Sequence, residues 1–103
     1  MTYQDFARLR TGAKDCNSFE LFLADEGGSV DCGDAEALVE DLRWIYCNRT
    51  IRQIRASTGL SQAAFAAAYG IPKRSIENWE EGDRNAPDYV TSMVAFAAFA
   101  DRR

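Results

Sequence analysis

The sequence predicts an all-α protein with a small N-terminal helical lobe followed by a second helical bundle. Three observations support this: apolar residues recur at helical spacing, capping residues precede these segments, and glycines follow most of them. Only two of the 103 residues are proline, and an apolar content of 47 % indicates a folded chain. We place the two parts at residues 1–48 and 49–103.

The N-terminal lobe is expected to form three helices. The first closes near Gly12, the second is capped by Ser18 and ends at Gly27-Gly28, and the third runs from Asp34 to near Asn48. Residues 29–33 are short and bounded by glycine, which predicts a turn or loop. The apolar side chains that identify the three helices are Tyr3, Phe6 and Leu9; Phe19, Phe22 and Leu23; and Leu38, Leu42, Trp44 and Ile45.

The C-terminal part is expected to form four helices with clearer starts and stops. The first begins with Thr50-Ile51-Arg52-Gln53, which has the T-x-x-Q form of a capping box, and it stops at Gly59. The second helix is capped by Ser61 and stops at Gly70. The third runs from Pro72-Lys73 to Glu81 and stops at Gly82, and the fourth starts after Pro87. The apolar set expected on the last helix is Val90, Met93, Val94, Ala97 and Phe99.

Charge is unevenly distributed along the chain, whose net charge is −4. Residues 1–48 carry ten acids and four bases, for −6, whereas residues 49–84 carry six bases and four acids, for +2. The stretch from Leu42 to Ile76 contains six cations and no carboxylate. Such a stretch can form a locally positive face that binds phosphate on an acidic protein, although a solvated basic surface explains the charge alone equally well.

The composition argues against several kinds of chemistry. Without histidine there is no Ser-His-Asp or Cys-His catalytic pair. Three cysteines (Cys16, Cys32 and Cys47) without a C-x-x-C spacing fit partly buried free thiols better than a zinc site or a disulfide framework. The carboxylate pairs at 25–26 and 40–41 have no catalytic partner and are expected to be solvated. We therefore expect no enzymatic activity, no metal and no cofactor.

The chain shows no sign of membrane insertion or export. No apolar run approaches the roughly 20 residues of a membrane span, and the N-terminus lacks the pattern of a secretory signal. We expect a cytoplasmic protein with no membrane partner.

Residues 60–82 combine the features that two short helices need where they meet across a tight turn. Gly70 tolerates the positive φ of such a turn, and Ala66 is small where the second helix crosses the first. The apolar side chains expected to fill the angle, with the tryptophan pointing inward, are Phe65, Tyr69, Ile71, Ile76 and Trp79. The polar residues left on the outer face of the second helix are Lys73, Arg74, Ser75, Glu77 and Asn78.

This segment resembles the helix-turn-helix domain of the Cro/lambda-repressor type, also called the XRE family. The residues that carry the resemblance are L-S-Q (60–62), F-A (65–66), Y-G-I-P (69–72), S-I-E-N-W-E (75–80) and Gly82. It covers about residues 50–100 and does not extend to residues 1–48. The resemblance implies a lambda-repressor-like helical bundle that binds double-stranded DNA.

The resemblance also implies roles for individual residues. Lys73, Arg74 and Asn78 match base-facing positions, and Glu77 is a further candidate because glutamate can accept from cytosine N4. Gln62 is expected to contact a phosphate and brace the recognition helix. The other residues expected to meet the DNA backbone are Ser75, Arg84 and Asn85, with Arg49, Arg52 and Arg55 at the periphery if their helix faces that way.

Four positions limit this reading. Glu77 and Glu80 are alternatively surface ion-pair partners of Arg74 and Lys73, and we favour this role over base contact. Pro72 replaces a capping residue, and Asp83 lies where a cation would help phosphate binding. Neither departure breaks the fold.

The implied function is sequence-specific duplex binding by a transcriptional regulator, most simply a repressor that occupies a promoter. One short recognition helix reads few bases, so a homodimer on two half-sites about one DNA turn apart is expected. The apolar side of residues 89–100 is expected to divide between core and dimer contact. The alternative is an antitoxin or phage-type inhibitor whose acidic N-terminal lobe binds a protein partner while the helix-turn-helix regulates its own promoter.

Overall fold

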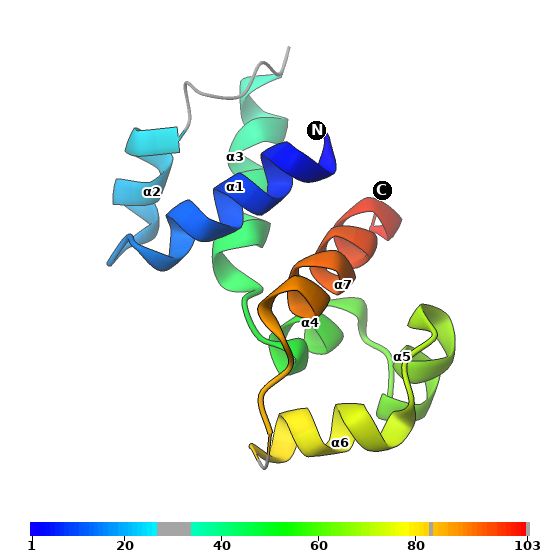
Figure 1. Cartoon of the computed structure of the whole chain (residues 1–103). Helices are drawn as coiled ribbons and strands as arrows, with labels where there is room; N and C mark the ends of the chain where they lie inside the picture. Colours follow the sequence, from blue (N-terminus) through cyan, green and yellow to red (C-terminus); the bar gives the residue numbers. More distant parts are fainter. Residues whose placement is uncertain (27–33, 83, 103) are drawn as a thin grey trace. The chain divides into compact units, whose positions relative to one another are not determined.

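The computed structural model describes residues 1–26, 34–82 and 84–102, and these ranges contain seven α-helices and no strand (Figure 1). The predicted all-α class is confirmed. The chain divides into two compact units, Met1–Cys47 (unit 1) and Asn48–Arg103 (unit 2). The predicted stop at residues 27–28 and the predicted loop at 29–33 lie outside the described residues.

Unit 1 consists of three mutually packed helices: α1 (Tyr3–Lys14), α2 (Phe19–Glu26) and α3 (Ala35–Cys47). Two of their starts were predicted: Ser18 Oγ accepts from the Leu21 N–H at 3.3 Å, and Asp34 Oδ1 accepts from the Glu36 N–H at 3.0 Å. The buried apolar side chains of unit 1 are Phe6, Leu9, Ala13, Phe22, Leu38, Leu42 and Ile45. These residues form its core.

Helix α1 continues two residues past the glycine at which we expected it to close. Gly12 stays within the helix, and a Cβ at this position would lie 2.9 Å from the Glu26 carboxylate oxygen. Glu26 Oε2 in turn accepts from Arg8 at 2.9 Å. A larger residue at this position would have to displace the Glu26 side chain, and the helix ends at Lys14 with Asp15 as its C-cap.

Unit 2 consists of α4 (Ile51–Thr58), α5 (Gln62–Tyr69), α6 (Lys73–Glu81) and α7 (Asp88–Asp101). Helix α4 packs against α6 and α7, and α5 packs against α6. The predicted capping box is confirmed, because Thr50 Oγ1 accepts from the Gln53 N–H at 3.2 Å and Gln53 Oε1 accepts from the Thr50 N–H at 3.1 Å. The buried apolar side chains of this unit are Ile51, Ile54, Phe65, Ala66, Ile76, Val94, Ala95, Ala98 and Phe99.

The apolar set expected on α7 divides between buried and exposed positions. Val94 and Phe99 are buried, whereas Met93 is 58 % exposed. The remaining two members of the predicted set are only partly buried. The residues on the buried face are Thr91, Val94, Ala95, Ala98 and Phe99. Thr91 lies on this face because its hydroxyl donates to the Pro87 carbonyl at 3.3 Å, which satisfies its polar group inside the unit.

The turn between α5 and α6 has the geometry that the sequence predicts. Gly70 has φ +66°, and its N–H donates to the Ala66 carbonyl, as does the Ile71 N–H at 3.1 Å. Phe65, Ala66 and Ile76 are buried in the angle between the helices. The other apolar members, Tyr69, Ile71 and Trp79, are partly buried, so the tryptophan keeps an exposed edge.

We predict that Gly70→Ala destabilises the protein through the backbone alone. A Cβ at this position has open space around it, so the cost is that of the left-handed conformation, about 1–2 kcal/mol of unfolding free energy. Urea denaturation measures this loss. Gly70→Asn should lose less, because asparagine tolerates this conformation better. Equal stability of the alanine variant and the parent would contradict this account of the turn.

Candidate nucleic-acid interface

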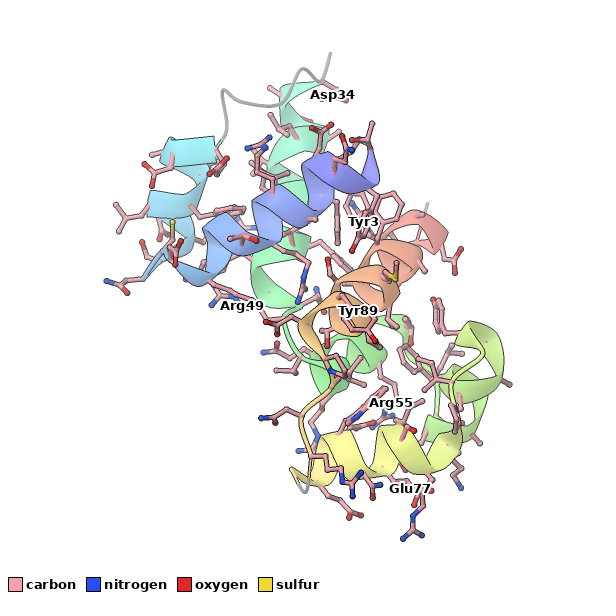
Figure 2. All side chains as sticks on the ribbon, in the orientation of Figure 1. Tyr3, Asp34, Arg49, Arg55, Glu77 and Tyr89 are labelled. Atoms are coloured by element: carbon pink, nitrogen blue, oxygen red, sulfur yellow. The ribbon has the colours of Figure 1, made fainter. Side chains whose placement is uncertain are left out.

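Helix α6 presents its polar residues on the side away from the unit 2 core. Its buried residue is Ile76, whereas Lys73 and Arg74 are exposed. Ser75, Glu77 and Asn78 are partly exposed. Figure 2 shows Glu77 on the outer side of α6 and Arg55 on the opposite side, between α6 and α4. The helix thus separates an outer polar face from an inner packed face.

Charge on α6 runs against the helix dipole. The first turn carries Lys73 and Arg74 and no acid, and the last turns carry Glu77, Glu80 and Glu81 and no base. Pro72 at the N-cap provides no side-chain cap, as expected for proline, which has no side-chain hydrogen-bond acceptor. Cations beside the positive end of a helix destabilise the isolated helix by a few tenths of a kcal/mol each, up to about 1. The same arrangement concentrates positive potential where an anion would bind.

Lys73 and Glu77 form a loose ion pair on the outer face. Lys73 Nζ lies 3.8 Å from Glu77 Oε1, one helical turn apart, and both side chains are accessible to water. Such a pair contributes about 0–1 kcal/mol to the stability of the fold, and on a helix the order Lys before Glu is less favourable than Glu before Lys. Both groups therefore remain available to a ligand at low cost.

Glu80 lies on the inner side of α6, which corrects our expectation of a surface partner for Arg74 or Lys73. Its side chain is 1 % exposed. Its oxygens accept from Arg55 Nη2 at 2.7 Å and Arg55 Nε at 2.9 Å, and from Gln62 Nε2 at 3.4 Å. Arg52 Nε lies 3.6 Å from Glu80 Oε1. We call these four side chains the Glu80 network.

The hydrogen bonds from Arg55 lower the pKa of the Glu80 carboxyl, against the opposing effect of its burial. The same bonds raise the pKa of Arg55. Because the folded-state pKa of Glu80 is lowered, its contribution to stability is complete above the ordinary glutamate pKa. It is lost as the pH falls through the folded-state value. At neutral pH the Glu80–Arg55 pair is therefore in its ionised form.

Three residues that the sequence assigns to phosphate binding belong to this network. Gln62 donates from α5 to Glu80 on α6, which agrees with the bracing role expected of it. Arg55 also donates to the Leu60 carbonyl at 3.1 Å, so this geometry supports a structural role for it in place of the expected phosphate contact. Arg52 is 70 % exposed and reaches the network from its edge.

Three other predicted backbone-contacting residues lie at the two ends of α6. Ser75 is in its first turn, where its N–H donates to the Pro72 carbonyl at 3.0 Å. Arg84 and Asn85 are exposed in the connection to α7. Asp83 lies outside the described residues. The Arg49 N–H donates to Gln53 Oε1 at 2.9 Å, and this residue precedes α4.

The Glu80 network was missed by sequence reasoning. Arg55 and Glu80 are 25 residues apart, so neither helix periodicity nor a capping pattern relates them. One signal was present in the sequence: Arg55 has no acidic residue three or four positions away, so any carboxylate partner had to come from another helix.

The described residues show no other arrangement with recognisable site chemistry. They contain no group of three or more histidine, cysteine or acidic side chains placed to hold a metal ion. Cys16 is partly buried, as predicted, but Cys47 is exposed, and Cys32 lies outside the described residues. Burial and the nearby Asp25 raise the pKa of the Cys16 thiol, which disfavours the reactive thiolate.

None of the helices in the described ranges has both the length and the apolar character needed to cross a bilayer.

Comparison with known proteins gives one match, which lies within the second unit. A family model described as helix-turn-helix matches residues 51–91, which extend from the start of α4 into the first turn of α7. No curated protein and no solved structure matches the chain. The match includes the whole of the turn and the outer face of α6, and it confirms the resemblance stated from the sequence.

We predict that Arg55→Ala and Arg52→Ala differ sharply in stability. Removing Arg55 leaves the buried Glu80 carboxylate without its main partner, which should cost about 3 kcal/mol of unfolding free energy. Arg52 is largely exposed and more distant, so its removal should cost about 0.5 kcal/mol or less. Denaturant unfolding of both variants measures the difference. Equal losses would show that Glu80 does not depend on Arg55.

Proposed function

We propose that residues 51–91, which match a helix-turn-helix family model, form a DNA-binding domain of the Cro/lambda-repressor (XRE) type. This match supports a DNA-binding transcriptional regulator, and in this proposal the domain reads a specific duplex site and acts as a repressor. One observation carries this proposal: the outer face of α6 places Lys73 and Arg74 on an uncapped first turn. This arrangement is unfavourable for the helix alone and favourable beside the phosphates and guanines of a groove.

The outer face of α6 supplies side chains suited to the major groove. Lys73 and Arg74 match guanine O6 and N7, and Asn78 matches adenine N6 and N7. Glu77 can accept from cytosine N4 once its loose contact with Lys73 opens. We assign base reading to these four residues.

Phosphate contacts are assigned to residues around this helix. Arg84 and Asn85 follow it and are exposed, and Ser75 lies in its first turn. Gln62 uses one amide N–H toward Glu80 and has a second for a phosphate. Arg52 has most of its guanidinium in solvent. These contacts fix the register of the helix on the duplex and carry no sequence information themselves.

A homodimer follows from the small reach of one recognition helix. Tyr89 and Met93 are 67 % and 58 % exposed and lie four residues apart on α7, so they occupy the same side of that helix. This apolar pair supports a contact between two copies. Two copies bound to adjacent half-sites would cover a promoter and exclude other proteins from it, which is the simplest mechanism of repression.

Selection of bound sites from a random duplex pool tests the proposed function directly. The full-length protein should enrich a site made of two inverted half-sites whose centres are about 10 base pairs, one helical turn, apart. No enrichment over the input pool would reject sequence-specific binding. Enrichment of a single half-site would reject the dimer and retain the reading helix.

We predict that Arg74→Ala and Arg84→Ala affect binding in different ways. Arg74→Ala should lose about 1–3 kcal/mol of discrimination at one base pair of the selected site, and Asn78→Ala should act similarly at another. Arg84→Ala should weaken binding to all sequences alike and reduce the salt slope by about 1. Titrations against the selected site and its single-base variants measure both effects. A base-specific effect of Arg84→Ala would contradict this assignment.

A further inference from the structure

Glu80 holds donors that the DNA backbone would also attract. Its carboxylate is buried, and the donors around it come from both α4 and α5. Two of them, Gln62 and Arg52, are residues assigned above to phosphate. A phosphate oxygen and a carboxylate oxygen are both anionic acceptors, so Glu80 and the duplex compete for the same N–H groups.

The competition differs among the three donors. Arg55 gives two short hydrogen bonds to Glu80 and is partly buried, so it stays with the carboxylate. Gln62 is more distant at 3.4 Å, and Arg52 at 3.6 Å is largely in solvent. Arg52 and Gln62 are therefore the two donors that can be divided between Glu80 and a phosphate.

We propose that Glu80 is a positioning residue that makes binding selective: it anchors α6 to α4 and α5 and restrains Arg52 and Gln62 from binding any phosphate backbone. The inference rests on the proposed DNA-binding function. Without the carboxylate, Arg52 and Arg55 lose their common counter-charge, and the free cationic groups strengthen binding to every sequence. Sequence discrimination then falls, because phosphate contacts carry no sequence information.

A purely structural role for Glu80 has a different signature. A loosened or partly unfolded domain would bind the specific site and an unrelated duplex less well, and the number of phosphates neutralised would not rise. The salt dependence of non-specific binding therefore separates the two roles, since its slope reports that number.

The experiment compares Glu80→Gln with Glu81→Gln in the full-length protein. Both variants remove one negative charge from the last turn of α6, but Glu81 is exposed and Glu80 is buried in the network. Each is titrated with the selected site and with a scrambled duplex of the same length over a series of salt concentrations. Thermal unfolding of each variant ensures that the titrations are made on folded protein.

Glu80→Gln should lower the ratio of specific to non-specific affinity about tenfold, a typical coupling within one contact network. Its non-specific salt slope should steepen by about 0.9, the value of one added phosphate contact. Glu81→Gln should change both affinities together and leave their ratio as in the parent. Glu80→Asp retains the charge on a shorter side chain and should keep the parental slope.

The outcomes distinguish the two proposals. If the parent protein shows no preference for any duplex, the proposed function fails and this inference fails with it. If the parent is selective and Glu80→Gln behaves like Glu81→Gln, the restraint by Glu80 is rejected while sequence-specific binding stands. A loss of both affinities with an unchanged slope also rejects it, in favour of a structural role.

Discussion

A buried carboxylate needs a counter-charge and hydrogen-bond donors, and in unit 2 this need fixes the position of α6. Leaving an ionised side chain without partners away from water costs several kcal/mol, so Glu80 can be buried only where Arg55 reaches it. The two hydrogen bonds from Arg55 tie α6 to α4 with the Glu80 side of the helix facing inward. Ile76 is buried by the same rotation, and the opposite side of the helix is left polar.

This anchoring explains how α6 tolerates an unfavourable charge pattern. Its first turn is cationic and uncapped, and its last turns are acidic, so both ends oppose the helix dipole. A nine-residue helix with this pattern would be marginal in water without tertiary contacts. Packing against α4 and α5 supplies the missing stability, and the cations on the outer face are kept for a ligand. The unfavourable interaction of these cations with the helix dipole is present in the free protein, and it is offset when an anion binds beside them.

The sequence predicted those features that depend on residues close together in the chain. The box at Thr50, the cap at Ser61 and the turn at Gly70 each involve contacts within five residues, so the local pattern contains the whole interaction. The outer face of α6 was predictable for the same reason, because 3.6-residue periodicity places its polar side chains opposite Ile76.

The errors arose where a distant segment decides the outcome. Gly12 lies inside α1, beside Glu26 of another helix, and no local signal contains that neighbour. On α7, the sequence left open which residues face the core, and the buried face includes Thr91 because its hydroxyl is satisfied by the Pro87 carbonyl. Glu80 was expected at the surface because no nearby residue in the sequence indicates a buried partner. Its partners lie on α4 and α5, which are distant in the sequence.

The same distinction between local and distant charge governs how an acidic protein can bind DNA. At physiological ionic strength, interactions between exposed charges are largely screened beyond about 8 Å. The net charge of −4 therefore matters less for a phosphate at α6 than the groups within that distance. Among those groups Glu80 is the nearest anion to Arg52 and Arg55, and burial exempts it from most of the screening. A single inner carboxylate consequently has more influence on the phosphate-binding strength of this face than exposed acids elsewhere in the sequence.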